Sequence, residues 1–134
     1  RQTFISTYIH DIFSGSNPTA VPITKSKLFA FGKLVAIDDP LTEGPEITSK
    51  TIDNARRMYV FSSQGKDLTL VMFNGSLLSV FSRNPILENP REMAVVGGRG
   101  RFRHASGFIT VNTQYFNTTN GDAVLEYNVE VVHP

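Results

Sequence analysis

Residues 83–108 read RNPILENPREMAVVGGRGRFRHASGF, and this stretch decides how the rest of the chain is interpreted. Three of the ten glycines fall within four of its residues, directly after the apolar run 93–96. Adjacent glycines allow a tight turn or a bulge between two strands. The stretch therefore predicts a strand, a glycine corner and a second strand.

A phosphate-binding loop is the alternative for this corner, but its pattern does not fit. The third glycine of G-x-G-x-x-G, counted from Gly98, would fall on Arg103, and no strand–helix–strand unit surrounds it. We expect Arg101 and Arg103 to lie on the surface. Arg91 is different, because it stands between Pro90 and a very apolar run, and we expect it to pair with a buried carboxylate.

Outward from this corner, the chain consists of short runs of β-branched and aromatic residues separated by turn signals. The expected strands are residues 2–11, 29–38, 54–63, 68–72, 77–81, 93–96, 102–111 and 123–132. No window has sustained helical spacing with caps at both ends. We therefore predict an all-β fold, an eight-stranded antiparallel β-barrel, formed by residues 1–134 as one domain. Asn74-Gly75 predicts the turn of a hairpin.

The composition narrows the possible partners. The 134 residues carry a net charge of +1 without a basic or acidic block, so nucleic acid and anionic membranes are not indicated. No apolar run is long enough to span a bilayer. The absence of cysteine excludes disulfides and thiolate nucleophiles, and the three histidines have no metal-ligand spacing, so we expect no metal site.

Two features bear on the compartment. Asn74 and Asn117 begin glycosylation sequons, which predict N-glycosylation and weakly favour secretion. The chain starts at Arg1 with no apolar leader, as we expect of a mature, processed chain.

Asp11 is the first candidate for chemistry. In an alternating strand over residues 2–11 it shares a face with Ile5 and Ile9, so it becomes a carboxylate in apolar surroundings if that face is the interior. The other interpretation is that Asp11 lies past the strand end and caps the turn that begins at Ser14. Both interpretations are open at this point.

Several motifs together resemble the plant dirigent proteins. They are YIHDI (8–12), DDPLTEGP (38–45), FNGS (73–76), RNP (83–85) and REMAVVGG (91–98). The resemblance runs in order from about residue 4 to residue 133. It implies an eight-stranded antiparallel β-barrel that forms a homotrimer, is secreted to the apoplast, needs no cofactor and binds a small phenolic substrate.

The resemblance leaves more than one function open. Pterocarpan-synthase-type members, which this chain resembles most, are carbon–oxygen lyases. They dehydrate an isoflavanol through a quinone methide, which an internal phenol then attacks. Lignan-forming members direct the coupling of two coniferyl alcohol radicals made by a separate oxidase. A non-catalytic barrel that carries a phenolic ligand, or serves in plant defence, is the third possibility.

The resemblance also assigns residues. It implies catalytic roles for Asp11 as general acid and for Arg91 and Tyr59 at the quinone oxygen, while Asp39 is either a second acid or the cap of a turn. The expected substrate-binding residues are Thr7, Ile9, Phe81, Asn84 and Ala123.

This chain departs from the family pattern at three places. Lignan-forming members have a second aspartate where this chain has Asn84, and an amide cannot exchange a proton as a carboxyl does. Residues 52–59 read IDNARRMY, where Gly-Arg-Ala-Gln-Gly is frequent. Ser82 stands where glycine is frequent.

Overall fold

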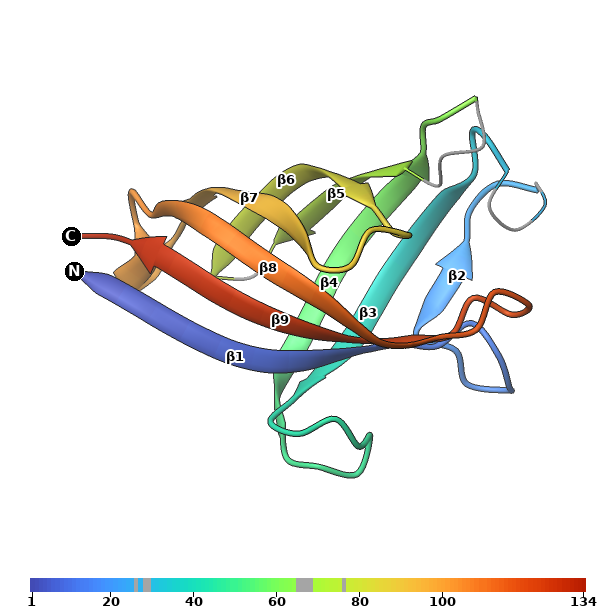
Figure 1. Ribbon diagram of the computed structural model, residues 1–134, viewed down its shortest axis with the longest axis horizontal. Helices are drawn as coiled ribbons and strands as arrows, with labels where there is room; N and C mark the ends of the chain where they lie inside the picture. The colour runs from blue at the N-terminus through green and yellow to red at the C-terminus, as the bar shows by residue number, and fades with distance from the viewer. Residues whose placement is uncertain (26, 28–29, 65–68, 76) are drawn as a thin grey trace.

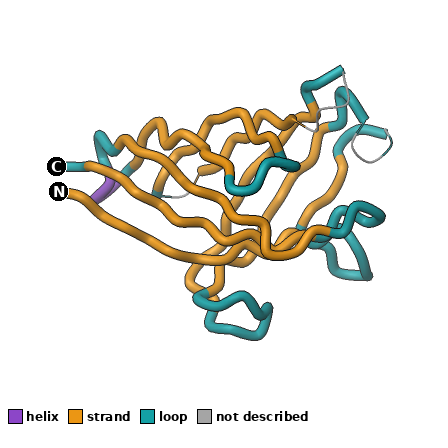
Figure 2. Tube along the Cα trace, viewed as in Figure 1, coloured by secondary structure: helices purple, strands orange, loops and turns teal. Residues whose placement is uncertain are grey.

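The computed structural model describes residues 1–134 except 26, 28–29, 65–68 and 76, and for residues 69–75 it describes the backbone alone. Almost all of the described chain is strand or loop, as Figure 2 shows. The strands found in it are β1 (Gln2–Asp11), β2 (Ala20–Pro22), β3 (Leu34–Thr42), β4 (Thr51–Phe61), β5 (Thr69–Gly75), β6 (Leu78–Pro85), β7 (Arg91–Gly98), β8 (Ser106–Phe116) and β9 (Ala123–Val132). A short 3-10 helix, η1 (Gly100–Phe102), precedes β8.

The sheet closes on itself. Its order is β1-β9-β8-β7-β6-β5-β4-β3-β2, and β1 pairs in addition with β3 through Tyr8–Thr42 and Ile9–Leu41 (Figure 1). The eight long strands thus form the predicted eight-stranded antiparallel β-barrel, and closure leaves few free edges. The three-residue strand β2, which the sequence did not predict, pairs with β3 beyond the point where β1 ends.

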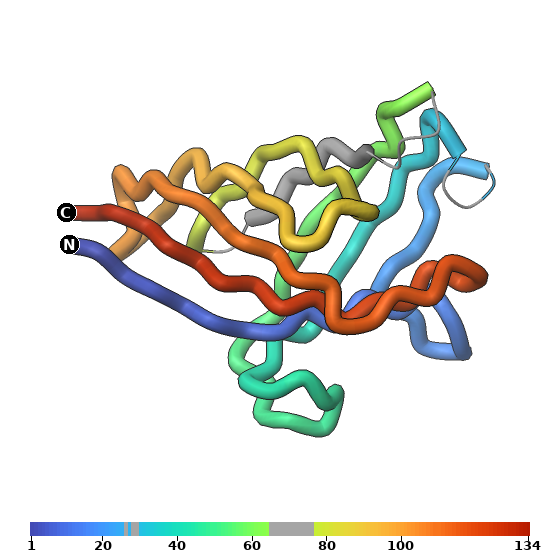
Figure 3. The backbone as a smooth tube through the Cα atoms, in the orientation of Figure 1, coloured from blue at the N-terminus to red at the C-terminus, as the bar shows by residue number. Residues whose placement is uncertain are grey.

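The two ends of the barrel differ. The chain termini lie side by side at one end, where the backbone N–H of His133 donates to the carbonyl of Arg1 at 2.8 Å (Figure 3). Phe102 from η1 fills this end, is 2% exposed and packs edge-to-face on His133 with ring centroids 5.0 Å apart. The last residues of β1, β4, β6 and β8 lie at the opposite end.

Period-two alternation directs side chains into the barrel. On β9, Leu125, Tyr127, Val129 and Val131 are buried, which is the face predicted for them. Asp11 lies on the interior face of β1 and is 7% exposed. Asp11 is therefore a buried carboxylate, and the interpretation as a turn cap is wrong.

Three local predictions need correction. The turn expected after Asp38 does not form; β3 continues to Thr42, so Asp39 is fully buried in a strand and caps no turn. Asn74-Gly75 is not the hairpin turn, because both residues still pair with β6, Gly75 opposite Ser79. The strand expected over residues 102–111 begins at Ser106, because η1 occupies the preceding residues.

The glycine corner lies between β7 and β8, as predicted. A Cβ atom on Gly98 would lie 2.4 Å from the carbonyl oxygen of Phe102, so a larger residue would push η1 away from the strand. Gly100 has a φ of +60°, a conformation that favours glycine. Arg101 and Arg103 are exposed, also as predicted, and the Arg101 guanidinium stacks on Phe102.

Candidate active site

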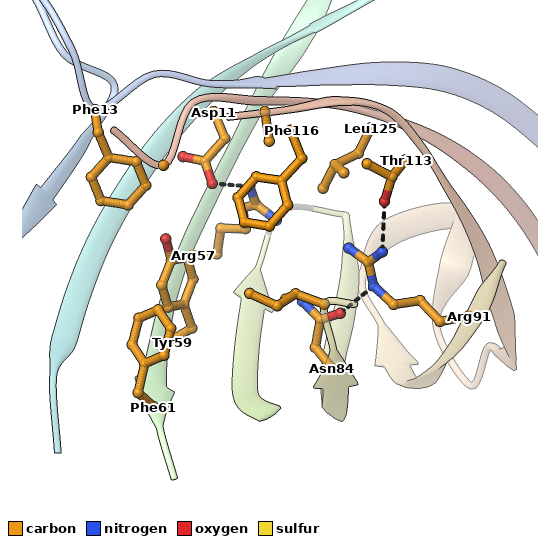
Figure 4. Close-up of a pocket in the computed structure, with 13 residues that line it drawn as sticks. Asp11, Phe13, Arg57, Tyr59, Phe61, Asn84, Arg91, Thr113, Phe116 and Leu125 are labelled. Carbon is orange, nitrogen blue, oxygen red and sulfur yellow. Dashed lines mark hydrogen bonds and ion pairs between the residues drawn. The ribbon is translucent and has the colours of Figure 1, made fainter. Parts of the chain in front are cut away.

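A pocket opens into the barrel at the end opposite the termini. It encloses about 480 Å³ between its lining atoms, including the part that opens to solvent. Figure 4 shows Asp11 and Arg57 on one side of it and Arg91 with Asn84 on the other. The remaining lining residues are Phe13, Tyr59, Phe61, Ile86, Thr113, Phe116, Gly121, Ala123 and Leu125. Polar groups thus face one another across apolar and aromatic walls, the usual character of a small-molecule site.

Asp11, at the end of β1, is the ionisable group with the strongest claim to proton transfer. Its Oδ2 lies 3.7 Å from Nη2 of Arg57, and its buried Oδ1 has no hydrogen-bond partner among the described residues. Burial, followed by the nearby charge of Asp39, raises the pKa of Asp11 to about 7, although Arg57 opposes the rise. A carboxyl with a pKa in this range is present in both its protonated and its ionised form near neutral pH.

Arg57, on β4, is the residue that the sequence interpretation missed. Its Nη2 donates to Oδ2 of Asp39 at 2.5 Å, and its Nη1 donates to the hydroxyl of Tyr127 at 3.0 Å. Burial alone would lower the pKa of Arg57, but Tyr127, Asp39 and Asp11 together raise it above the ordinary value. Arg57 is therefore a permanent buried cation. Alternation on β4 places it on the same face as Tyr59, and this signal could have found it.

Tyr59 lines the pocket, as predicted, and its hydroxyl points toward Asp11 (Figure 4). The ring packs edge-to-face on Phe61 with centroids 5.6 Å apart. Burial raises the pKa of Tyr59 far above its ordinary value, and the charge of Asp11 adds to this effect. Tyr59 is thus a neutral hydrogen-bonding group on the side of the pocket that holds Asp11.

Arg91 forms the opposite wall and pairs with no buried carboxylate among the described residues, so that prediction is wrong. Its Nε donates to Oδ1 of Asn84 at 2.6 Å, and its Nη1 donates to Oγ1 of Thr113 at 2.9 Å and to the Glu88 carbonyl at 3.3 Å. Burial lowers the pKa of Arg91 from its ordinary value. The two buried carboxylates, Asp11 and Asp39, contact Arg57 instead.

The predicted substrate-binding residues divide into three groups. Asn84 and Ala123 line the pocket. Thr7 and Ile9 are buried inside the barrel but do not line it, and Thr7 donates to the carbonyl of Thr42 at 3.0 Å. Phe81 is 50% exposed on β6, between strand neighbours that face inward, so its prediction as a pocket residue is wrong.

Three phenylalanine rings form part of the apolar wall, and the sequence interpretation had assigned none of them to the site. Phe13 follows β1, Phe61 ends β4 and Phe116 ends β8, so three separate strand ends bring their rings to one opening. Only the closure of the sheet places them together. Periodicity within a single strand carries no information about this neighbourhood.

The predicted glycosylation sites remain predictions. Asn117 lies in the turn after β8, partly exposed, and its side-chain oxygen accepts the backbone N–H of Thr119 at 2.8 Å. Asn74 lies in β5, and its side chain is outside the described residues. In the part of the chain that the structure describes, no cluster of three or more His, Asp or Glu side chains could hold a metal ion.

Comparison with known proteins establishes the class. The family model for dirigent-like proteins matches residues 2–132, so the chain belongs to the dirigent family. Dirigent protein 15 of Arabidopsis thaliana is 48% identical over 99% of this chain and 80% of its own length. Pterocarpan synthase 1 of Glycyrrhiza echinata is 42% identical over 98% of this chain and 78% of its own length.

The solved structures agree with the fold. The pterocarpan synthase dirigent protein GePTS1 superposes with a TM-score of 0.92 at 38% identity, covering 99% of this chain and 88% of that one. Among the described residues, no helix is long and apolar enough to cross a membrane. The chain is thus a dirigent-family barrel that is similar to pterocarpan synthases in both sequence and structure.

Proposed function

We propose that this chain is a carbon–oxygen lyase that dehydrates a 2′-hydroxyisoflavanol through a quinone methide, giving a pterocarpan or an isoflavene. The observation that carries the proposal is Asp11, a buried carboxyl with a pKa near 7 and one unpartnered oxygen, in the wall of an aromatic pocket. The similarity to pterocarpan synthases at 42% identity supports the substrate class.

Asp11 acts as the general acid in the first step. Its proton moves to the benzylic hydroxyl of the substrate, the C–O bond breaks with both electrons going to oxygen, and water leaves. The phenol on the same ring system gives up its proton as electrons flow toward the benzylic carbon, and this proton passes through water to the Asp11 carboxylate, which regenerates the acid. The product of the step is one water and a neutral quinone methide. An acid with a pKa near the working pH suits this transfer, because it is protonated often enough and still gives up its proton.

Arg91 stabilises the oxygen on which negative charge develops. It lies across the pocket from Asp11, so a flat substrate could reach both groups at once (Figure 4). A cation fixed by Asn84 and Thr113 needs no reorganisation when the phenol gives up its proton. Tyr59, whose hydroxyl points toward Asp11, would hold the leaving hydroxyl, which modifies the expectation that it acts at the quinone oxygen.

The second step closes the ring. The 2′-hydroxyl oxygen attacks the electrophilic carbon, a C–O bond forms, and the proton of the 2′-hydroxyl returns to the quinone oxygen by way of pocket groups or water. Loss of a proton from the neighbouring carbon instead gives the isoflavene. The aromatic wall formed by Phe13, Phe61 and Phe116 would keep the intermediate away from bulk water, which otherwise adds to quinone methides.

An anaerobic incubation with a 2′-hydroxyisoflavanol tests the proposal. We expect each substrate molecule to lose one water with no oxidant present, and mass spectrometry detects this loss. Asp11→Asn should abolish the loss of water. Asp38→Asn, which replaces an exposed carboxylate on β3, should leave it unchanged. Persistence of the substrate in the presence of the folded protein contradicts the proposal. Stereoselective coupling of coniferyl alcohol that requires an added oxidase would favour the lignan-forming alternative.

We propose in addition that the chain assembles as a homotrimer through its outer apolar face. Large apolar side chains project from neighbouring strands into solvent, and Phe4 and Phe108 both lie beside Glu130 in the register. The most exposed members on β1, β6, β7, β8 and β9 are Phe4, Phe81, Val96, Phe108 and Val132. A face of this kind on a monomer marks an interaction site. Light scattering should give a molar mass three times that of one chain. In Phe108→Glu the molar mass should fall to that of a single chain.

A further inference from the structure

Two buried carboxyl groups share one buried guanidinium at the floor of the pocket, and the sharing is unequal. Arg57 contacts Oδ2 of Asp39 at 2.5 Å with a hydrogen bond, whereas its distance to Oδ2 of Asp11 is 3.7 Å. All three side chains are at least nine-tenths buried. One cation cannot compensate two anions at such a site, so the group of three binds one proton more readily than separate side chains would.

The geometry decides where that proton resides. Burial raises the pKa of Asp39 as well as that of Asp11, but at Asp39 the rise is opposed by the charge of Arg57, by a hydrogen bond from Thr19 and by the direct hydrogen bond from Arg57. At Asp11 the opposing contact is longer, and the negative charge of Asp39 adds to the effect of burial. The hydroxyl of Tyr127 accepts from Nη1 of Arg57 and holds the guanidinium in this orientation.

We propose that Arg57 is a positioning residue that holds the negative charge of the carboxyl pair on Asp39 and leaves the proton on Asp11, facing the pocket. This inference rests on the proposed function, since it explains how the general acid stays protonated. Arg57 lies in residues 52–59, the segment in which this chain departs from the sequence that is frequent in the family. The inference therefore gives this departure a physical role.

The neighbourhood of Asp11 contains no second cation as close as Arg57 among the described residues. The titratable groups that act on Asp11 or on its partner Arg57 from the surrounding elements are Asp39 of β3, Arg57 and Tyr59 of β4, Asp122 before β9, Tyr127 of β9 and, across the pocket, Arg91 of β7. Asp122 accepts hydrogen bonds from the Ser14 hydroxyl and from the backbone N–H groups of Ser14 and Phe13, and these lower its pKa against the effect of burial.

The chain offers a matched control for this arrangement on the outer face of the same two strands. Arg56 and Asp38, adjacent in sequence to Arg57 and Asp39, form a 4.0 Å ion pair in which both side chains are more than half exposed. A substitution in this outer pair replaces the same residue type, and changes the net charge by the same amount, as the corresponding substitution in the inner pair Arg57–Asp39. It leaves Asp11, Asp39 and Arg57 in place, and a surface pair of this kind contributes little. The charge of Asp38 adds weakly to the raised pKa of Asp39 but is not among the charges that act on Asp11, so the Asp11 midpoint is the quantity to compare.

The experiment is a titration of aspartate side-chain carboxyl carbons by NMR in the labelled, full-length chain. Near pH 6 we expect a protonated carboxyl at Asp11 and an ionised one at Asp39. In Asp39→Asn, Arg57 no longer has a competing anion, so the midpoint of Asp11 should fall by more than one pH unit. Asp38→Asn should leave this midpoint unchanged.

The outcomes are separable from those of the proposed function, because the titration needs no turnover. A proton on Asp39 rather than Asp11 in the unsubstituted chain overturns the inference, and this measurement does not depend on any variant folding. An unmoved Asp11 midpoint in Asp39→Asn overturns it as well. If the midpoints behave as expected but no substrate loses water, the proposed function fails and the charge assignment stands.

Activity provides a second readout if the substrate is dehydrated. The pH above which Asp39→Asn loses activity should move to lower pH, following the Asp11 midpoint, while the activity at pH values below that midpoint is retained. A purely structural role of Asp39 predicts instead a uniform loss at all pH values, and that result would overturn the inference.

Discussion

Arg91 donates its Nε–H to Oδ1 of Asn84 at 2.6 Å, so the arginine in the wall opposite Asp11 is held by an amide and not by a carboxylate. The guanidinium therefore keeps its full positive charge toward the pocket. An aspartate at this position, as the resemblance implies for lignan-forming members, would neutralise that charge. The pair Asn84–Arg91 and the pair Asp39–Arg57 thus make the two walls of the pocket electrically different.

Asn84→Asp should weaken dehydration without unfolding the barrel. The introduced carboxylate would take a stronger, charge-assisted hydrogen bond from Arg91 and reduce the field at the developing quinone oxygen. We expect kcat/KM to fall by about tenfold, which corresponds to ~1.4 kcal/mol of transition-state stabilisation. Thr113→Val removes the hydrogen bond that Arg91 donates to a neutral hydroxyl, introduces no charge and should have a smaller effect. An unchanged kcat/KM in Asn84→Asp would mean that Arg91 does not act on the reacting oxygen.

Asp11→Asn should abolish the acid step while keeping the shape of the pocket. Loss of a general acid typically costs about 10²- to 10⁴-fold in rate. Kinetics of water loss should show this fall in kcat, with little change in the affinity for an unreactive isoflavone. Asp38→Asn serves as the control because its carboxylate is exposed and binds the side chain of Asn54 at the surface. Comparable activity in both variants would contradict the role of Asp11.

The stability of the fold should depend on pH through Asp11. Its pKa is about 7 in the folded state against 3.8 ordinarily, so between these values the folded state binds the extra proton. The free energy of unfolding should therefore fall as pH rises from about 4 to 7, by up to about 4 kcal/mol, and then level off.

Urea unfolding at a series of pH values measures this dependence. Asp11→Asn should flatten the curve and should be more stable than the unsubstituted chain at pH 8, because a neutral amide replaces an ionised buried group. A free energy of unfolding that does not fall with pH over this range would contradict a protonated Asp11 in the folded state. Asp39 titrates in the same site and remains in the variant, so a residual slope is expected.

Phe102→Ala should destabilise the closed end without changing the chemistry. Phe102 is 2% exposed, and loss of a buried phenylalanine ring costs about 3–5 kcal/mol. Since the pocket opens at the other end, the folded fraction should retain its activity. Phe31→Ala, which truncates a ring that is 56% exposed, should shift the melting temperature little. A loss of activity in fully folded Phe102→Ala would show that the two ends are coupled.

Much of the fold could be predicted because barrel strands carry a local signal. β1 and β9 have the predicted bounds, since ten residues of alternating pattern stand next to turn residues, which follow β1 at residues 14–18 and precede β9 at residues 120–122. The failures occurred where a tertiary pairing overrode a local signal. Asp38-Asp39-Pro40 has turn chemistry, yet pairing with β4 extends β3 through it to Thr42. Asn74-Gly75 is a favoured turn, yet both residues stay paired with β6.

The residues of the site show the same division between local sequence signals and tertiary pairing. The sequence alone determined the all-β class and the glycine corner, because each depends on neighbours within a few residues. It left open whether Asp11 faces the interior or caps a turn, and the buried position in the structure decided this. Only the tertiary structure decided that Asp11 and Asp39 contact Arg57 and that Arg91 binds Asn84. These partners lie on strands whose order and register are set by closure of the sheet, and charges separated along the chain interact only after closure has buried them together.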